Sequence, residues 1–284
     1  MIKNSFKTIL LLGVLSALLI LIGGMVSPGL IWVFGGLALL LNLAAYFFSD
    51  KIVLKMNRAY PVSEAEAPGL HHIVSELSHE AGIPKPRVFI VEDPAPNAFA
   101  TGRNPKNGVV AVTTGIMHLL TERELRGVVA HELAHIKNRD ILIATIAAMV
   151  AAAIAMIASV IKWGAIFGGM RSDDEGGGGN LFAALAIAIV APIAATIVQL
   201  AISRSREYGA DATGARISGD PRALASALAK LQRGNKRVRF HTVGDNPATA
   251  SLFICSPFSG QSLSQLFSTH PPISERIKRL SEME

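Results

Sequence analysis

Four long runs without a charged residue constrain the fold of this chain more than any other feature of its sequence. Residues 8–27 and 29–48 are each long enough to cross the hydrocarbon core of a bilayer as a helix, which takes about 20 residues. Glycine and proline separate these two runs, which indicates a helical hairpin. Residues 141–161 and 181–202 form a second uncharged pair. The sequence therefore predicts a mostly α-helical integral membrane protein with about four transmembrane helices.

The composition supports membrane insertion, because an ordinary soluble domain is less apolar. Half of the 284 residues are hydrophobic, only 17% are charged, and the mean hydropathy is +0.41. Two alternatives remain open. The second pair of runs could be a buried helix hairpin of a soluble domain, and residues 1–24 could be a signal peptide, since Lys3 and Lys7 precede an apolar stretch. No cleavage site of the usual small-residue type follows, so we interpret this segment as a retained anchor.

Basic residues indicate on which side of the membrane the polar parts lie. If all four runs span, only Lys162 and Arg171 of the 27 Lys and Arg residues lie on one side. Lys and Arg near membrane ends stay in the cytoplasm, so the polar parts should face the cytoplasm. The predicted organisation is an N-terminal transmembrane hairpin at 1–50, a cytoplasmic part at 51–140, a second transmembrane or membrane-embedded hairpin at 141–202, and a cytoplasmic part at 203–284.

The net charge of +6 does not indicate a nucleic-acid-binding protein. Most basic residues are spread along the flanks of the apolar runs, and the cluster at 233–239 is more simply a solvated loop or one facing anionic lipid. The expected partner is the lipid bilayer, with no nucleic acid. Cys255, the single cysteine, excludes an internal disulfide and fits a reducing compartment.

A metal-binding motif narrows the chemistry. His131-Glu-Leu-Ala-His135 has the pattern H-E-x-x-H, and helical spacing places both imidazoles on one face, where they can reach one metal ion with Glu132 beside it. Thr121 followed by Glu124 forms a capping-box signature, so the motif should lie on a well-specified helix. The alternative is a solvated helix whose His and Glu side chains merely form hydrogen bonds with each other.

The polar parts predict an α+β domain. A helix through Leu70, Ile73 and Leu77 should end near Gly82. The turn-rich segment 104–108 should join an extended piece at 97–100 to a strand at 109–112 as a hairpin. The expected strands are 87–91 and 109–112, with a short extended piece at 97–100, and further helices should begin at Asp220-Pro221 and near Pro272.

A catalytic zinc site needs a third protein ligand besides the two histidines. Glu207 and Asp211 lie four residues apart on an expected helix, so both can face the H-E-x-x-H helix. One of the two could bind the metal while the other orients a ligand histidine. From spacing alone, an ordinary salt-bridged helix start beside Arg204 and Arg206 is equally compatible.

The sequence resembles the HtpX-type membrane zinc metalloproteases, bacterial relatives of the CAAX prenyl endopeptidases in the gluzincin group. The resemblance covers essentially the whole chain. It rests on the two N-terminal apolar runs and on the motifs Asn97-Ala-Phe-Ala-Thr-Gly102, His131-Glu-Leu-Ala-His135, Ser205-Arg-Glu-Tyr-Gly-Ala-Asp211, Asn246-Pro-Ala-Thr-Ala250 and Thr269-His-Pro-Pro-Ile-Ser-Glu-Arg-Ile277.

The resemblance implies a zincin-like protease domain and a role for each motif. It makes Glu207 the third zinc ligand and Asp211 a partner of the ligands. It makes His270 the residue that stabilises the tetrahedral intermediate, with Arg276 nearby. The predicted substrate-binding edge strand consists of Asn97, Ala98, Phe99 and Ala100.

The resulting hypothesis is a zinc-dependent endopeptidase with one Zn²⁺ per chain, in which Glu132 takes a proton from the attacking water. Its expected substrates are unfolded, damaged or misassembled membrane proteins, cleaved at the cytoplasmic side of a bacterial inner membrane during quality control and stress response. Two alternatives stay open. One is a prenyl-protein endopeptidase, although those relatives have more membrane spans. The other is a membrane scaffold or chaperone that binds zinc structurally, which would need a fourth protein ligand.

Overall fold

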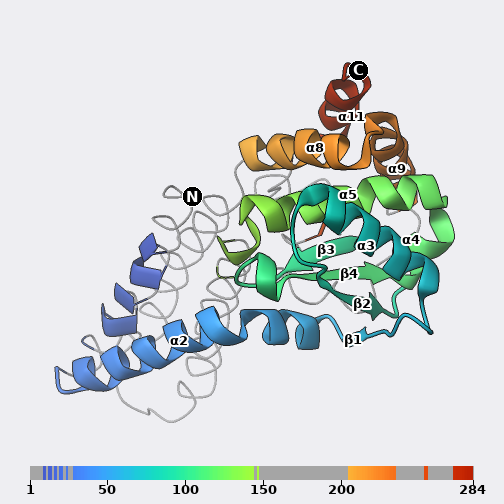
Figure 1. Ribbon diagram of the computed structural model, residues 1–284. Coiled ribbons are helices and arrows are strands. Elements are labelled where there is room, and N and C mark those ends of the chain that lie inside the picture. The colour runs from blue at the N-terminus through green and yellow to red at the C-terminus, as the bar shows by residue number, and fades with distance from the viewer. Residues whose placement is uncertain are drawn as a thin grey trace, which may run out of the picture.

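The computed structural model describes residues 28–143, 204–234 and 271–283, together with residue 146, residues 253–254 and parts of 9–24. The predicted runs at 141–161 and 181–202 lie almost wholly outside the described residues, as does His270. The main elements, shown in Figure 1, are α2 (Leu30–Met56), β1 (Ala59–Pro61), α3 (Pro68–Ala81), β2 (Arg87–Val91), β3 (Ala98–Thr101), η1 (Pro105–Asn107), β4 (Val109–Thr113), α4 (Thr114–Leu119), α5 (Glu122–Asn138), α8 (Arg204–Ser218), α9 (Pro221–Gly234) and α11 (Ile273–Ser281).

Helix α2 carries the second predicted membrane run. Its segment Leu30–Phe48 is long and apolar enough to cross a bilayer, and very little of it is buried inside the molecule. Among the described residues it is the one helix that meets this test, and the first predicted run contains a shorter apolar helix, Leu12–Leu21. Asn42 Nδ2 donates to Ser16 Oγ over 2.8 Å, which joins these two helices. The prediction of four membrane spans is thus supported at one helix and stays a prediction for the others.

Among the described residues, four strands form one mixed sheet in the order β1-β2-β4-β3, which places β3 at an edge of that sheet. Strands β2 and β4 are parallel, whereas β1 and β3 are antiparallel to their neighbours. The predicted hairpin between β3 and β4 is confirmed, with the 3-10 turn Pro105–Asn107 in the connection. Strand β1 was not expected, because Ala59–Pro61 is too short to show an alternating pattern and contains a proline.

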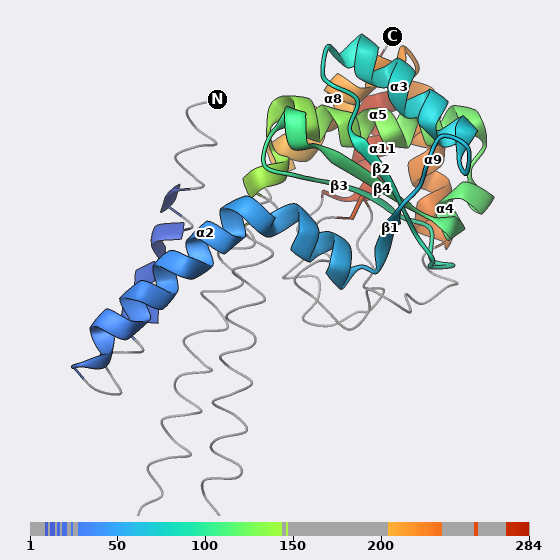
Figure 2. The ribbon, with the colours of Figure 1, turned by 60° about the horizontal axis from the view of Figure 1, so that its bottom comes forward.

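Alternate strand residues bury the two faces of the sheet against different helices. Val88 and Ile90 point into the core that α3 and α5 share with the sheet. Phe89 and Val91 point to the opposite face, where Val53 and Leu54 from the last turns of α2 pack with them. Figure 2 shows α2 crossing below the sheet at this end while its N-terminal half projects away from the folded body. The apolar helix is therefore fixed to the sheet by its polar end.

Local signals in the sequence explain where the other helices begin. The predicted capping box is present at the start of α5, where the side chains of Thr121 and Glu124 each accept a hydrogen bond from the other residue's backbone N–H. Asp220 Oδ1 accepts from Ala223 N–H at the start of α9, over 3.0 Å. Helix α11 follows Pro272, also as predicted. The short helix α4 carries no comparable amphipathic pattern and was not expected.

Helix α5 lies at the centre of the helical layer. It packs against the sheet and α3 on one side and against α8 and α9 on the other (Figure 1). Glu124 strengthens the contact with α9, because its carboxylate accepts from Ser226 Oγ and Lys230 Nζ, each over 2.7 Å. The helix that carries the H-E-x-x-H motif is therefore held between the sheet and α3 on one side and α8 and α9 on the other.

Candidate metal centre

Helix α5 presents the three polar residues of the H-E-x-x-H motif to the interior. His131 and Glu132 are almost completely buried, and the side chain of His135 keeps 16% of its surface exposed. The apolar residues of the same turns, Leu133 and Ile136, fill the core against the sheet. One end of the site is thus closed and the side at His135 is open to solvent.

Helix α8 brings two carboxylates to the motif. Glu207 and Asp211 lie one turn apart and both are buried, as their spacing predicted. Gly214, one turn further, lies so close to α5 that a Cβ atom there would be 2.8 Å from the backbone nitrogen of His131. The close packing of the two helix backbones at Gly214 therefore sets the distance between Glu207 and the histidines.

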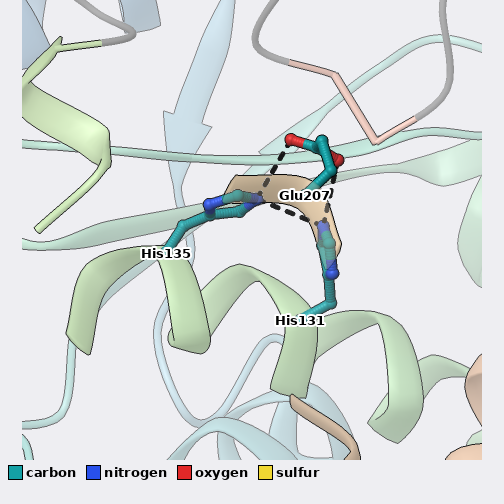
Figure 3. Close-up of side chains that lie close together, drawn as sticks. All are labelled: His131, His135 and Glu207. Atoms are coloured by element: carbon teal, nitrogen blue, oxygen red, sulfur yellow. Dashed lines mark hydrogen bonds and ion pairs between the residues drawn. The ribbon is translucent and has the colours of Figure 1, made fainter. Parts of the chain in front are cut away.

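Three side chains converge with the geometry of a metal site (Figure 3). The Nε2 atoms of His131 and His135 are 3.2 Å apart. Glu207 Oε1 is 3.6 Å from His135 Nε2, and Glu207 Oε2 is 3.8 Å from His131 Nε2. Ligands at 2.0–2.1 Å from a tetrahedral zinc ion lie about 3.3 Å from each other. Two imidazoles and one carboxylate at these separations fit Zn²⁺ by both donor chemistry and spacing.

A carboxylate holds the outer nitrogen of each histidine. His131 Nδ1 is 3.0 Å from Asp211 Oδ1, and His135 Nδ1 is 3.4 Å from Asp140 Oδ2. A proton on each Nδ1 leaves the Nε2 lone pairs directed at the shared point beside Glu207. Burial lowers the pKa of His131, which favours the neutral imidazole that a metal requires. Burial opposes protonation of His135 too, but Asp140 and Glu207 outweigh it and raise its pKa to about 9.

Arg276 fixes the orientation of Asp211. This guanidinium is fully buried, and its Nε and NH2 groups donate to the two oxygens of Asp211 over 2.8 and 2.7 Å. Its remaining NH1 group lies 3.2 Å from the carbonyl oxygen of Ile254 and 3.6 Å from Glu207 Oε2. Although burial disfavours a charged carboxylate, Arg276 and His131 lower the pKa of Asp211 to about 2. Asp211 is therefore ionised and locked in place at neutral pH.

Glu132 lies beside the convergent side chains and is held by the edge strand. The backbone N–H of Ala100 in β3 donates to its carboxylate. Burial, assisted by the charge of Glu207, raises the pKa of Glu132 to about 7. A carboxylate that titrates near neutral pH is suited to accept a proton and to return it.

Strand β3 turns only part of the predicted substrate strand outward. Asn97 and Phe99 direct their main-chain groups toward β4, and the Phe99 ring is buried against Phe253 with 5.3 Å between ring centroids. The main-chain groups of Ala98 and Ala100 point the other way, toward the edge of the sheet that no further strand covers among the described residues. There the carbonyl oxygen of Ala98 accepts from Ile254 N–H over 3.1 Å. A substrate strand at this edge would have to replace Ile254 at Ala98.

Two residues of the site were missed from the sequence. Asp140 follows the motif by five residues, and it reaches His135 because Arg139 takes a left-handed conformation that ends α5 and folds the chain back. Gly214 follows Asp211 by three residues on one helical face, so a small residue at that position was the available signal for a close helix contact. His270 lies outside the described residues, and its predicted role stays a prediction.

Comparison with known proteins agrees with this geometry. The model of Peptidase family M48 matches residues 64–284, which include the motif, both carboxylates of α8 and Arg276. The chain belongs to peptidase family M48. As a member of this family it is a metallopeptidase, which confirms the predicted enzyme class. Helix α2 supports the assignment of this metallopeptidase to a membrane.

Relatives of this M48 peptidase align over its whole length. Proteins named Protease HtpX homolog from Syntrophobacter fumaroxidans and Pelotomaculum thermopropionicum are each 54% identical to it, over 99% of this chain and 99% of their own. The predicted resemblance to HtpX-type proteases is thereby confirmed. The crystal structure of S. mikatae Ste24p shares the fold, with a TM-score of 0.53 and 19% identity over 98% of this chain and 66% of that chain.

Proposed function

We propose that this M48 peptidase is a zinc-dependent endopeptidase whose metal ligands are His131, His135 and Glu207. The observation that carries the proposal is the convergence of two Nε2 atoms and one carboxylate at ligand separations. The carboxylates of Asp211 and Asp140 on the outer nitrogens support it, because they hold both imidazoles in the tautomer that a metal needs. One Zn²⁺ would be held per chain.

Zinc bound there would polarise the scissile carbonyl and lower the pKa of a water molecule. Side chains of the protein carry out the proton transfers and orient the metal ligands. Glu132 takes the proton of the attacking water and later delivers it to the leaving amine. Arg276 keeps Asp211 ionised and oriented, and Asp211 keeps the Nδ1 proton on His131. By the family resemblance, His270 would stabilise the negative charge of the tetrahedral intermediate.

The proposed substrates are unfolded, damaged or misassembled membrane proteins. Main-chain groups of the small residues Ala98 and Ala100 point away from β4. With Ile254 displaced from the Ala98 carbonyl and the Ala100 N–H kept on Glu132, the two carbonyl oxygens would bind an extended chain with little selection among its side chains. The anchoring of the sheet to the polar end of α2 keeps this edge near the bilayer. From the distribution of Lys and Arg, we infer that the site faces the cytoplasm and that four helices span the membrane.

The scaffold alternative has less support. A closed structural zinc site needs four protein ligands, whereas the group found among the described residues has three. Family membership also favours an enzyme. The prenyl-protein endopeptidase alternative shares the proposed metal chemistry and differs in substrate, so a prenylated peptide offered beside an unfolded protein would separate the two.

The test is cleavage of an unfolded protein by the purified full-length chain in detergent, after chelation and addition of zinc. Glu132→Gln should retain one zinc per chain and lose about 10²-fold or more in cleavage rate, because only the proton acceptor is removed. Glu122→Gln is the matched control, since Glu122 lies exposed in the first turn of the same helix. Equal cleavage by wild type and Glu132→Gln would overturn the proposed mechanism, and a lack of zinc in the wild type would overturn the ligand set.

A further inference from the structure

A cavity lies away from the metal centre, at the polar end of the membrane segment of α2. It has a volume of about 410 Å³, and it is lined by Phe47, Phe48, Asp50, Lys51, Arg87, Arg103 and Asn107. These residues come from three places: the last turns of α2, the first residue of β2, and the connection between β3 and β4. The cavity shares no residue with the metal centre.

Its position along α2 places the cavity at the surface of the bilayer. The apolar segment ends at Phe48, and Lys51 follows within one turn. Phe47 and Phe48 are about half exposed, at 48% and 50%. Aromatic residues gather at the boundary between hydrocarbon and headgroups, and basic residues gather just beyond it. The cavity therefore lies at the depth of the lipid phosphates.

The charges around the cavity favour an anion. Three of the lining residues are cationic and one, Asp50, is acidic. Arg87 is paired with Asp50 over 2.5 Å. Lys51 and Arg103 instead lie 5.6 Å from the ring centres of Phe48 and Phe47, and no carboxylate partner of either is found among the described residues. Within the described part of the chain, these two cations give the cavity its net positive charge.

The wall formed by the β3–β4 connection is held by a close backbone approach and by hydrogen bonds within the connection. Gly102 has a φ of 129°, and a Cβ atom there would lie 2.3 Å from the carbonyl oxygen of Asn107. Asn104 Oδ1 accepts from the backbone and the side-chain nitrogen of Asn107, over 3.1 and 2.9 Å. These contacts fix Asn107 and the backbone next to Arg103 before a ligand binds, which lowers the entropy cost of ordering this wall.

We propose that this cavity binds the phosphate group of an anionic phospholipid, with Lys51 and Arg103 as its charged partners. Leu40, Leu43 and Phe47 precede Lys51 at helical spacing and are exposed, so they form a continuous apolar strip for the acyl chains. A cavity of this size accommodates a small polar headgroup. Since Arg103 follows β3 by two residues, the bound lipid also fixes the height of the edge strand above the bilayer.

Native mass spectrometry of the full-length chain in neutral detergent tests this proposal, with dioleoyl-phosphatidylglycerol as the titrated lipid. Removing both charges in Lys51→Gln/Arg103→Gln should weaken lipid binding by about 10- to 30-fold. The matched control is Lys55→Gln/Lys106→Gln, which removes two exposed charges from the same helix and the same connection but none from the cavity. The charge-preserving exchange Lys51→Arg/Arg103→Lys should bind as the wild type does and shows that the altered cavity still folds.

Two comparisons separate the lipid from other sources of phosphate. Dioleoyl-phosphatidylcholine should bind more weakly than phosphatidylglycerol, and inorganic phosphate at millimolar concentration should not displace the lipid. The proposal fails if both double charge-removal variants lose affinity equally, if neither does, or if inorganic phosphate competes. Lipid binding is measured separately from peptide cleavage. A failure of the lipid-binding proposal would therefore leave the proposed protease function standing, and a failure of the protease proposal would leave the lipid site standing.

Discussion

At the scale of single residues, the candidate metal centre depends on carboxylates that are not ligands. Asp211 and Asp140 each meet the outer nitrogen of one histidine. Arg276 in turn donates a hydrogen bond to each oxygen of Asp211 in the interior, where an unpaired carboxylate would destabilise the fold. The H-E-x-x-H spacing predicted that His131 and His135 converge, and the family resemblance implied Glu207 as their partner. The sequence could not show Asp140, because its approach depends on a left-handed residue at the end of α5.

Asp140 gives a prediction that separates orientation from ligation. Asp140→Asn keeps the size of the side chain but removes the charge that faces His135 Nδ1. We expect the affinity for zinc to fall about tenfold or more while one zinc still binds at saturation. Competition with a chromophoric chelator measures the affinity. An unchanged zinc affinity would show that Asp140 has no part in holding His135.

Glu124 gives a prediction about acid stability. Burial alone would raise its pKa, but Lys230, Ser226 and Thr121 outweigh burial and lower it from 4.5 to about 2. A folded-state pKa below the unfolded value contributes stability above about pH 4.5, and this is lost as the pH falls toward 2. The full contribution is on the order of 3 kcal/mol.

The variant Glu124→Gln isolates this effect, since glutamine can keep the capping box but not the charge. Thermal unfolding of wild type and variant in detergent should differ most near pH 7, with the wild type more stable. The difference should shrink steadily between pH 4.5 and pH 2. A difference that is the same at pH 7 and pH 3 would contradict the assignment of the lowered pKa.

At the scale of elements, the site is assembled by the contact between α5 and α8. Sequence patterns predicted the existence of α3, α5, α9 and α11, because each has caps or an amphipathic face. Helix α8 differs, since it has little separation of apolar and polar faces. The spacing of Glu207 and Asp211 predicted that this helix can face α5, and the family resemblance singled out Glu207 as the ligand, but neither shows how closely the two helices pack at Gly214. The edge position of β3 likewise depends on a parallel pairing of β2 with β4 that local patterns do not encode.

The helix contact can be tested at Gly214. Gly214→Ala places a methyl group 2.8 Å from a backbone atom of α5, so α8 has to move away and carry Glu207 with it. We expect a loss of about 1–3 kcal/mol in stability and a weaker affinity for zinc. Gly209→Ala on the same helix is the control, because a Cβ atom there meets nothing within 4 Å. Equal zinc affinity in the two variants would mean that the close approach at Gly214 does not position Glu207.

At the scale of the whole molecule, the chain combines an apolar helix with a protease fold whose sheet rests on that helix. Composition and the uncharged runs predicted a membrane protein, and the family match confirms the metallopeptidase. What the sequence could not provide is the packing of Val53 and Leu54 beneath the sheet, which joins the two parts. Long-range contacts of this kind depend on the complete fold and leave no periodic pattern.

Metal removal should lower the thermal stability of the whole fold, because the ligands come from two helices that are far apart in sequence. We expect the Tm of the full chain to rise with zinc concentration, by an amount equivalent to about 2.7 kcal/mol at a hundredfold excess over Kd. Glu132→Gln should show the same rise, whereas Glu207→Gln should lose most of it. A Tm that does not respond to zinc in the wild type would count against a site that bridges α5 and α8.

The most direct test of the metal centre is zinc K-edge X-ray absorption on the full-length chain, loaded with zinc in detergent. With His131, His135 and Glu207 as ligands, we expect one zinc per chain surrounded only by nitrogen and oxygen at about 2.0–2.1 Å, including the scattering pattern of two imidazoles. Glu207→Ala should lose the metal or change the shell. A sulfur neighbour, a single imidazole, or an unchanged shell in Glu207→Ala would contradict the proposed centre.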